Sequence, residues 1–447
     1  MKKILAVFFA FLFISTTANA DTMQYLNIAF WDKFNDTTLT DNLMKVYQNN
    51  HDLKAAVLKV SASNRVVKMS FANELPHFTF DGYVGQIFSS SEQVFGQVRI
   101  PNYHESHFLL PIEMNYELDI WGQNHLRTKS KKKEFAMMQQ DERAAYIYLT
   151  SAFAADYYNL IRVDKLIELQ NELISTQEKV IKSFKIRYNA GTATVSDIET
   201  AEKNLTYMKE DLQKLKERQD LLKNQLAVLI SDRQFEDIKR TSYDNLNIDF
   251  AVPESIKYET LDQRPDRIKS VLNMEKLAID VKVARRDLLP KFVITGNLGF
   301  NLYSLHSPHT FLADIGVVPV WWDIFTGGRK WQMLKLKKDT YDIAIQEYEK
   351  TILTSIQETN DALYSMKTAD SIKNISYDRL NSDKKELKRC ELREDAGTTD
   401  ELDLLFREQK LITSDMQMVS ATVNKIITAI NLYQALGGVD FTKTENI

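Results

Sequence analysis

The sequence predicts a mostly α-helical protein with a smaller β component, arranged as a tandem internal repeat. Residues 123–190 and 329–396 contain neither glycine nor proline. Because these two residue types most often end helices, each stretch is expected to form one helix roughly 100 Å long. The chain has only 13 Gly and 8 Pro among its 447 residues, against average usages of about 7% and 5%. This composition excludes a turn-rich all-β fold.

The first 20 residues are expected to be an export signal. Two lysines precede an apolar run over residues 4–14, and a small-x-small cleavage site ends at Ala20. The apolar run is shorter than the roughly 20 residues that a membrane-spanning helix needs. We therefore expect residues 1–20 to be a cleaved signal peptide and the exported protein to have no transmembrane helix. Because no cysteine follows the signal, we also expect no lipid anchor.

Residues 21–230 are predicted to be the first repeat, which begins with a helix over 39–74 and continues with a strand pair over 75–88 and 107–121. In the second strand, apolar residues alternate with polar ones, among them Glu113, Asn115, Glu117 and Asp119. Alternation with a period of two is typical of a strand with one apolar and one polar face. Residues 89–106, rich in Ser, Gln and Asn, are predicted to be a loop.

The long helix over 123–190 is expected to end at a tip, residues 190–193. In Ala190-Gly191-Thr192 the glycine can adopt the left-handed conformation that ends a helix, and the following Thr194 and Asp197 suit the start of a returning helix. The returning segment has apolar residues at alternating spacings of three and four, which is typical of a coiled-coil seam. The unit is therefore predicted to be a long antiparallel hairpin of two helices.

The same order of elements returns in residues 263–438, the predicted second repeat. Its strand pair is expected over 290–303 and 310–325, its long helix over 329–396, and its tip over 396–399, where Ala396-Gly397-Thr398 matches the first tip. Residues 231–262, which are polar and contain a proline, are predicted to connect the repeats. Residues 439–447 are left as a C-terminal tail.

The four strands predict a membrane barrel that several chains build together. Each strand is long enough to cross a bilayer when tilted, which takes about 9–11 residues, and open sheet edges cannot face lipid. Four strands cannot close, and eight would enclose only side chains, so we expect three chains to form a 12-stranded transmembrane β-barrel in a bacterial outer membrane. Glu113, Asn115, Glu117 and Asp119 are expected to line its aqueous lumen. The hairpins would then continue into the periplasm as a long α-helical barrel.

Tryptophans mark the ends of the predicted strands. Trp121, Trp321 and Trp322 are three of the five tryptophans in the chain, and such side chains gather where a membrane meets water. We therefore expect these three to form an interfacial belt in contact with outer-membrane lipid.

Together these features resemble the TolC-type outer-membrane efflux proteins over roughly residues 39–438. The resemblance rests on the twofold repeat, the two Ala-Gly-Thr tips with a following aspartate, the segment Tyr116-Glu117-Leu118-Asp119-Ile120-Trp121-Gly122 and the ending Ala435-Leu436-Gly437-Gly438. The Tyr-Glu-Leu-Asp segment is closer to the multidrug or metal efflux branch. The resemblance implies a homotrimer that serves as the passive exit duct of a tripartite efflux or type I secretion system. Its partners would be a periplasmic adaptor (membrane fusion) protein and an inner-membrane pump.

The resemblance also implies roles for the residues at the hairpin tips. The tip residues match the family's adaptor-docking turns: Ala190, Gly191, Thr192, Ala396, Gly397 and Thr398. Leu402, Asp403 and Phe406 match the positions that set the periplasmic aperture. Asp403 matches a family gate aspartate, whereas Phe406 stands where a second aspartate is common. The plain alternative for Asp403 is a solvated residue near a helix N-terminus, where the helix dipole favours a negative charge.

Other classes of function have less support. The sequence has no nucleophile elbow, phosphate loop or His-Glu metal motif, so we expect no enzyme activity, no cofactor and no metal site. Cys390 is the one cysteine, so it can form neither an internal disulfide nor a metal site of several cysteines. The net charge of −4 gives no reason to expect a nucleic-acid partner. The alternative function is a non-conducting periplasmic coiled-coil scaffold or adaptor, although such adaptors usually carry one hairpin. The sequence leaves open whether the cargo is a drug, a metal or a protein.

Overall fold

The computed structural model describes residues 27–80, 82–88, 93–95, 98–100, 104–235, 237–248, 250–302 and 310–443. The expected signal peptide, residues 1–20, and the end of the tail, residues 444–447, lie outside the described residues. The chain divides into two compact units, and each takes segments from both sequence repeats. Unit 1 comprises Met1–Leu53, Ala145–Lys257 and Thr359–Ile447, and unit 2 comprises Lys54–Ala144 and Tyr258–Glu358.

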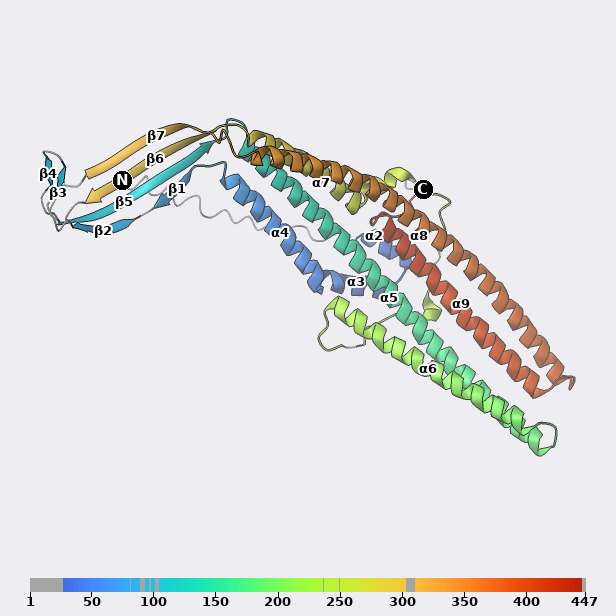
Figure 1. Cartoon of the computed structure of the whole chain (residues 1–447). Coiled ribbons are helices and arrows are strands. Elements are labelled where there is room, and N and C mark those ends of the chain that lie inside the picture. Colours follow the sequence, from blue (N-terminus) through green and yellow to red (C-terminus); the bar gives the residue numbers. More distant parts are fainter. Residues whose placement is uncertain are drawn as a thin grey trace. The chain divides into compact units, whose positions relative to one another are not determined.

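Unit 2 contains an antiparallel sheet with the strand order β1-β5-β6-β7, in which β2 also pairs with β5 (Figure 1). The strands are β1 (His77–Phe80), β2 (Tyr83–Phe88), β5 (His104–Leu118), β6 (Lys291–Leu302) and β7 (Thr310–Trp321). β5 and β6 come from different repeats and pair along most of their length, from Phe108 opposite Leu302 to Leu118 opposite Phe292. Both repeats therefore contribute to a single sheet.

The strand bounds differ from those expected in several places. The expected strand 75–88 is two strands, β1 and β2, and β7 ends at Trp321 rather than at residue 325. The segment 89–106, expected to be a loop, contains the strands β3 (Gln93–Phe95) and β4 (Val98–Ile100), which pair with each other, and β5 also starts within it. At its other end β5 stops at Leu118 rather than at residue 121. The chain turns there, since Gly122 has a φ of +64° and its N–H donates to Asp119 O (2.9 Å).

The helix expected over residues 39–74 is two helices, α3 (Thr37–Asn49) and α4 (His51–Ala72). Asn50 separates them with a ψ of 128°, outside the helical region. Its side-chain oxygen accepts hydrogen bonds from Asp52 N (2.9 Å) and Leu53 N (3.0 Å). Asn50 therefore caps α4, because its side chain satisfies N–H groups that the first helical turn leaves free. The matching helix of the second repeat is α7 (Pro265–Arg286).

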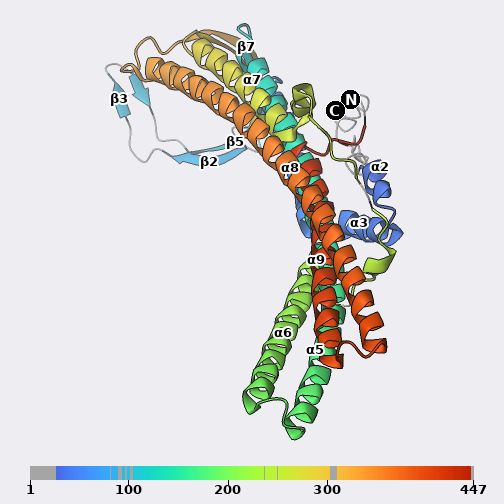
Figure 2. The same ribbon diagram turned by 90° about the vertical axis from the view of Figure 1, so that its right-hand side faces the viewer.

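The long helices are α5 (Gln123–Asn189) and α8 (Arg329–Asp395), and each begins in unit 2 and ends in unit 1. In unit 1, α6 (Val195–Ile230) returns along α5, and α9 (Glu401–Ala435) returns along α8 (Figures 1 and 2). The two hairpins meet through α5 and α9, where Leu169 packs with Ile412 and Val419. None of the helices that the structure describes combines the length and the apolar character needed to cross a membrane.

The core of unit 1 is aromatic and brings together the two ends of the described chain. Phe30 and Trp31 of α2 (Ile28–Trp31) are fully buried with Phe34 and with Tyr433 of α9. The rings of Phe30 and Tyr433 stack with their centroids 4.0 Å apart. Stacked aromatic pairs of this kind add to the stability that their buried area provides.

A buried carboxylate links α3 to α5 and to the connector, residues 231–262. Asp36 caps α3 by accepting a hydrogen bond from Leu39 N (3.1 Å). The same carboxylate accepts hydrogen bonds from Tyr157 OH of α5 (3.0 Å) and Thr241 Oγ1 of the connector (2.9 Å). Because a buried charge is stable only when it is well hydrogen-bonded, this network fixes three segments to one another.

Candidate channel tips and membrane-facing sheet

The first hairpin ends in a tight turn that closes the last turn of α5. Gly191 has a φ of +75°, and its N–H donates to Tyr188 O (2.9 Å). The backbone N–H and the hydroxyl of Thr192 both donate to Arg187 O, at 2.8 and 3.1 Å. This pattern satisfies carbonyl groups that a helix end leaves free, and it needs glycine at the left-handed position. Ala190, Gly191 and Thr192 are all exposed.

The second hairpin has the same turn. Gly397 has a φ of +68°, and its N–H donates to Glu394 O (2.8 Å). The N–H and the hydroxyl of Thr398 donate to Arg393 O, at 2.8 and 3.0 Å. Ala396, Gly397 and Thr398 are also exposed. The two repeats thus present two exposed turns of equal geometry, and neither turn is covered by the described part of the chain.

The two returning helices start differently, although Asp197 and Asp403 occupy the same position, the third residue after the cap. In α6, Thr194 and Asp197 form a reciprocal capping box. Hydrogen bonds from the backbone N–H and the hydroxyl of Thr194 lower the pKa of Asp197. In α9 the cap is Asp400, whose carboxylate accepts a hydrogen bond from Asp403 N (2.8 Å). The carboxylate of Asp403 is therefore free to make other contacts.

Asp403 is held by three side chains and is still 43% exposed. One carboxylate oxygen accepts hydrogen bonds from Thr399 Oγ1 (3.2 Å) and Cys390 Sγ (3.5 Å). The other oxygen lies 3.4 Å from Arg407 Nε, one turn further along α9. Burial, together with the Asp403 carboxylate, raises the pKa of the Cys390 thiol. Asp403 thus combines a fixed position at the start of α9 with a partly exposed negative charge.

The structure separates the two apolar residues predicted for the aperture. Leu402 is only 7% exposed and belongs to a buried cluster with Leu405, Val180, Ile181 and Ala201. Phe406, by contrast, is 43% exposed. Within the described chain, Leu402 therefore anchors the start of α9 against α5 and α6, whereas Phe406 presents its ring outward.

Ion pairs fasten both hairpins near the tips. Arg187 of α5 binds the carboxylate of Asp400, which joins the first hairpin to the second. Hydrogen bonds from Arg187 and from Asp403 N lower the pKa of Asp400. Between α8 and α9, Lys410 lies 2.9 Å from Glu386 and 3.0 Å from Asp383. These ion pairs were not predicted from the sequence. The signal that could have pointed to them is that Arg187 and Arg393 occupy equivalent positions before Gly191 and Gly397.

One face of the sheet in unit 2 is apolar and open. Residues directly opposite each other in a sheet point to the same face, and Phe80 lies opposite Ile112, which lies opposite Leu298. These three side chains are exposed, as are Phe78 on the same face and Ile315, which is 81% exposed. A soluble fold would bury such a surface, so this face needs an apolar partner.

The other face carries the residues predicted to line a lumen. Glu113 lies opposite Thr79 and Asn297, and both Glu113 and Asn115 are exposed. Glu117 lies on the same face and is 3.2 Å from Lys291 Nζ. Asp119 lies beyond the end of β5, and its carboxylate accepts a hydrogen bond from His125 N (2.8 Å) at the start of α5. The structure therefore brings the first three together and places Asp119 at a helix end.

The predicted belt residues lie where strands give way to helices. Trp121 follows β5, and its Nε1 donates to Pro290 O (2.7 Å). Trp322 follows β7, and its Nε1 donates to Leu288 O (3.1 Å). Both indoles are partly exposed, and Trp321 is the last residue of β7, opposite Lys291 in the sheet register. A ring that is half exposed and has its N–H satisfied suits a membrane–water interface.

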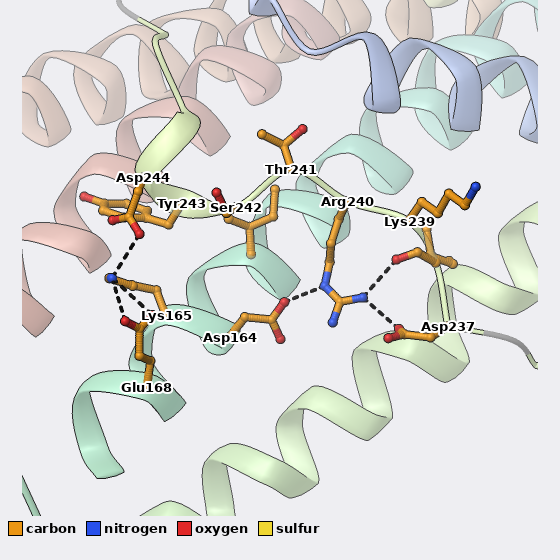
Figure 3. A pocket seen from close by; sticks show the side chains of 12 residues that line it. Asp164, Lys165, Glu168, Asp237, Lys239, Arg240, Thr241, Ser242, Tyr243 and Asp244 are labelled. Carbon is orange, nitrogen blue, oxygen red and sulfur yellow. Dashed lines mark hydrogen bonds and ion pairs between the residues drawn. The ribbon is translucent and has the colours of Figure 1, made fainter. Parts of the chain in front are cut away.

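The connector and α5 border a cavity of about 470 Å³ in unit 1. Figure 3 shows that Arg240 of the connector points at Asp164 and Asp237, and that Lys165 of α5 points at Glu168 and Asp244. Because these charges are paired with one another, the ion pairs that line the cavity hold the connector against α5. Among the described residues there is no group of His, Cys, Asp and Glu that could hold a metal ion.

An open apolar sheet face, a polar face behind it and two helical hairpins with exposed tips define a class of protein, a membrane channel subunit with a helical extension. The match to the outer membrane efflux protein family covers residues 43–231 and 257–438. The chain belongs to this family. It is an outer-membrane efflux channel, and the family consists of transport channels rather than enzymes.

Known relatives and solved structures agree with this assignment. The toluene efflux pump outer membrane protein TtgC of Pseudomonas putida is 24% identical over 419 residues, which cover 92% of this chain and 85% of TtgC. The structure of the Campylobacter jejuni CmeC outer membrane channel matches with a TM-score of 0.81 at 22% identity, over 91% of this chain and 87% of CmeC. The outer-membrane channel OprN matches with a TM-score of 0.80 at 20% identity, over 92% of both chains. The predicted fold class and the predicted family are thus confirmed.

Proposed function

We propose that three copies of this chain form the passive exit duct of a tripartite efflux system. The observation that carries the proposal is the exposed apolar face of the sheet, with Phe80, Ile112 and Leu298 side by side. For an exported protein of this family, the apolar partner that covers this face is the lipid of the outer membrane. The sheet edges then need partner strands, because unpaired backbone groups cannot face hydrocarbon. Because β1 and β2 pair with successive parts of β5, they count as one strand of the barrel. Three such four-stranded sheets close into a 12-stranded barrel with room for an aqueous lumen.

The remaining parts of the chain take matching roles in this assembly. Glu113, Asn115 and Glu117 line the barrel lumen, and Trp121, Trp321 and Trp322 form a belt at the periplasmic side of the membrane. The exported chain begins after the signal peptide, residues 1–20. The helical hairpins form the periplasmic tunnel, with Asp403 and Phe406 at its aperture and Leu402 behind them as an anchor.

The partners of the duct are a periplasmic adaptor protein and an inner-membrane pump. The two exposed turns, at Gly191 and Gly397, are the proposed docking points for the adaptor, since both present backbone groups of equal geometry. The cargo is proposed to be small molecules. The name of TtgC, the outer membrane protein of a toluene efflux pump, supports this class of cargo over proteins.

Native mass spectrometry of the detergent-purified full-length protein tests the assembly. We expect a mass three times that of one chain without its first 20 residues. A folded monomer, or a dimer, would contradict the barrel, because neither provides enough strands to enclose an aqueous lumen.

A further inference from the structure

A groove of about 760 Å³ lies in unit 1 between α5, α8 and α9. Its apolar wall includes Leu166 of α5, Ile372 and Ile375 of α8, and Met416 of α9. The two isoleucine side chains are exposed, at 46% and 59%. Sites for drug-sized molecules have volumes of about 300–1,000 Å³ and are mostly apolar with a few polar groups. The volume of the groove falls within this range, and its lining combines these apolar side chains with polar ones such as Thr413 and Gln417.

The charge in the groove comes from two arginines, Arg162 of α5 and Arg379 of α8. No carboxylate is among the described residues that line the groove. Arg379 donates a hydrogen bond to Gln417 Oε1 on α9. Arg162 is partly buried and has no hydrogen bond or ion pair within the described part of the chain. Burial and the nearby charge of Arg218 lower its pKa, but a guanidinium stays cationic at neutral pH.

Two other arginines in this chain, the buried Arg264 and the partly buried Arg240, are paired. Arg264 lies 2.6 Å from Asp266 and 2.5 Å from Glu358, and Arg240 binds Asp164. A buried charge without a partner costs free energy, so proteins usually pair it. Arg162 differs from these two because it has no ion-pair partner in the described part of the chain, and it lines an apolar groove. An unpaired cation beside apolar side chains complements a ligand with an apolar body and a negative group.

The groove lies on a different side of the helices from the connector. On α5, Asp164 binds Arg240 of the connector, whereas Leu166 lines the groove. Because successive residues of an α-helix are turned by about 100° around its axis, Leu166 is turned by about 200° from Asp164. On α8, Lys367 donates to Glu254 O of the connector (2.9 Å), and Arg379 points about 120° away. In the proposed duct we place the connectors outside the tunnel, so that the groove, on the other side of the helices, faces the lumen.

We propose that this groove is a binding site for amphipathic organic anions, which pass through the duct as cargo. The apolar body of the anion lies against Leu166, Ile372 and Met416, and its sulfonate or carboxylate group pairs with Arg162, with Arg379 beside it. This inference rests on the proposed function, since a ligand here is cargo only if the groove faces a conducting lumen. It narrows the cargo of the duct to a chemical class.

Isothermal titration calorimetry on the full-length trimer in detergent tests the site, with naphthalene-2-sulfonate as the probe and the same detergent in both solutions. We expect one sulfonate bound per chain and no binding of 2-naphthyltrimethylammonium, which has the same body and the opposite charge. Arg162→Gln should weaken sulfonate binding about tenfold, as expected for the loss of a charged partner, and Arg162→Lys should restore part of it. Lys182→Gln is the matched control, because Lys182 is an exposed cation on the opposite side of α5.

Several outcomes would overturn the proposal. Equal binding of the sulfonate and the ammonium compound would show that Arg162 does not select charge. Unchanged sulfonate binding in Arg162→Gln would remove Arg162 from the site. Loss of the trimer in Arg162→Gln, measured by native mass spectrometry, would show that a second copy of the chain covers the groove.

The calorimetric readout does not depend on conduction, so the two proposals can fail separately. A wild-type protein that conducts ions but does not bind the sulfonate contradicts the groove and leaves the duct intact. A trimer that binds the sulfonate but never conducts contradicts the duct, and with it the cargo role of the groove.

Discussion

At the scale of single residues, Asp403 and Asp197 show how one position in a repeat acquires two roles. Both are the third residue of a returning helix, but Asp197 is engaged by its own helix cap, whereas Asp403 is contacted by Cys390 and Arg407. Three copies of a partly exposed carboxylate near a threefold axis would repel one another and attract cations. The role of Asp403 as a gate follows from this placement and stays a prediction.

Asp403→Ala should enlarge the single-channel conductance of the trimer and reduce its preference for cations, because it removes three negative charges from the proposed aperture. Asp197→Ala removes the same number of charges from the other hairpin and should leave the conductance as in wild type. Planar-bilayer recording in asymmetric potassium chloride measures both quantities. Equal behaviour of the two variants would remove Asp403 from the gate.

Leu402 and Phe406 are predicted to respond differently to truncation. Leu402→Ala leaves a cavity in the cluster formed with Val180 and Ala201, and buried leucine truncations cost about 2–5 kcal/mol. Phe406 is 43% exposed, so Phe406→Ala should cost much less within one chain. Hydrogen exchange of the first turns of α9 should rise in Leu402→Ala and stay low in Phe406→Ala. The reverse order would contradict the anchoring role of Leu402.

At the scale of elements, the sequence predicted the regular parts of the fold well. α5 and α8 match the stretches free of glycine and proline, and the left-handed Gly191 and Gly397 end the hairpins as expected. These features depend on local backbone preferences, which can be inferred directly from the residue types. The break at Asn50 could not be predicted in the same way, because it depends on whether a single side chain turns back to cap the next helix.

Features that depend on residues far apart in the chain could not be predicted from the sequence. The burial of Leu402 arises from Val180 and Ile181, more than two hundred residues earlier in the chain. Arg162 is one cation among many along α5, and its lack of a partner is visible only once α8 and α9 lie beside it. Asp119 continues the alternation of β5 in sequence, but the turn at Gly122 takes it out of the strand.

The segment after α9 gives a pH-dependent prediction at this scale. Asp440 is buried and lies 2.5 Å from Lys33 Nζ. Burial alone would raise its pKa, but hydrogen bonds from Lys33 and Thr442 outweigh burial and lower it. Because the pKa is lower in the folded state, the pair contributes stability at pH values above about 3.9, the ordinary value for aspartate. This contribution is lost as the pH falls through the lowered folded value.

Thermal unfolding of wild type and Asp440→Asn between pH 7 and pH 2 measures the effect. The variant should be less stable than wild type at pH 7, and the difference should shrink as the pH falls below about 3.9. A difference that is constant over this range would show that the ionised form of Asp440 is not what stabilises the segment.

At the scale of the whole molecule, the two faces of the sheet are expected to respond differently to an added charge. Ile112→Lys places a charge on the apolar face, where such a change costs about 2–4 kcal/mol near the middle of a bilayer. Asn115→Lys places the same charge on the polar face and should leave membrane insertion unchanged. Insertion of the purified variants into liposomes, measured by protease protection of the sheet, separates the two. Equal insertion of both would contradict the assignment of the faces.

Single-channel recording of the full-length wild-type protein in a planar bilayer tests most directly whether this chain forms a duct through the outer membrane. We expect a small, cation-preferring conductance, because the proposed aperture carries Asp403 from each of the three chains. A folded trimer that inserts into the bilayer and passes no current in any state would contradict the duct. It would favour instead a non-conducting periplasmic scaffold built on the same hairpins.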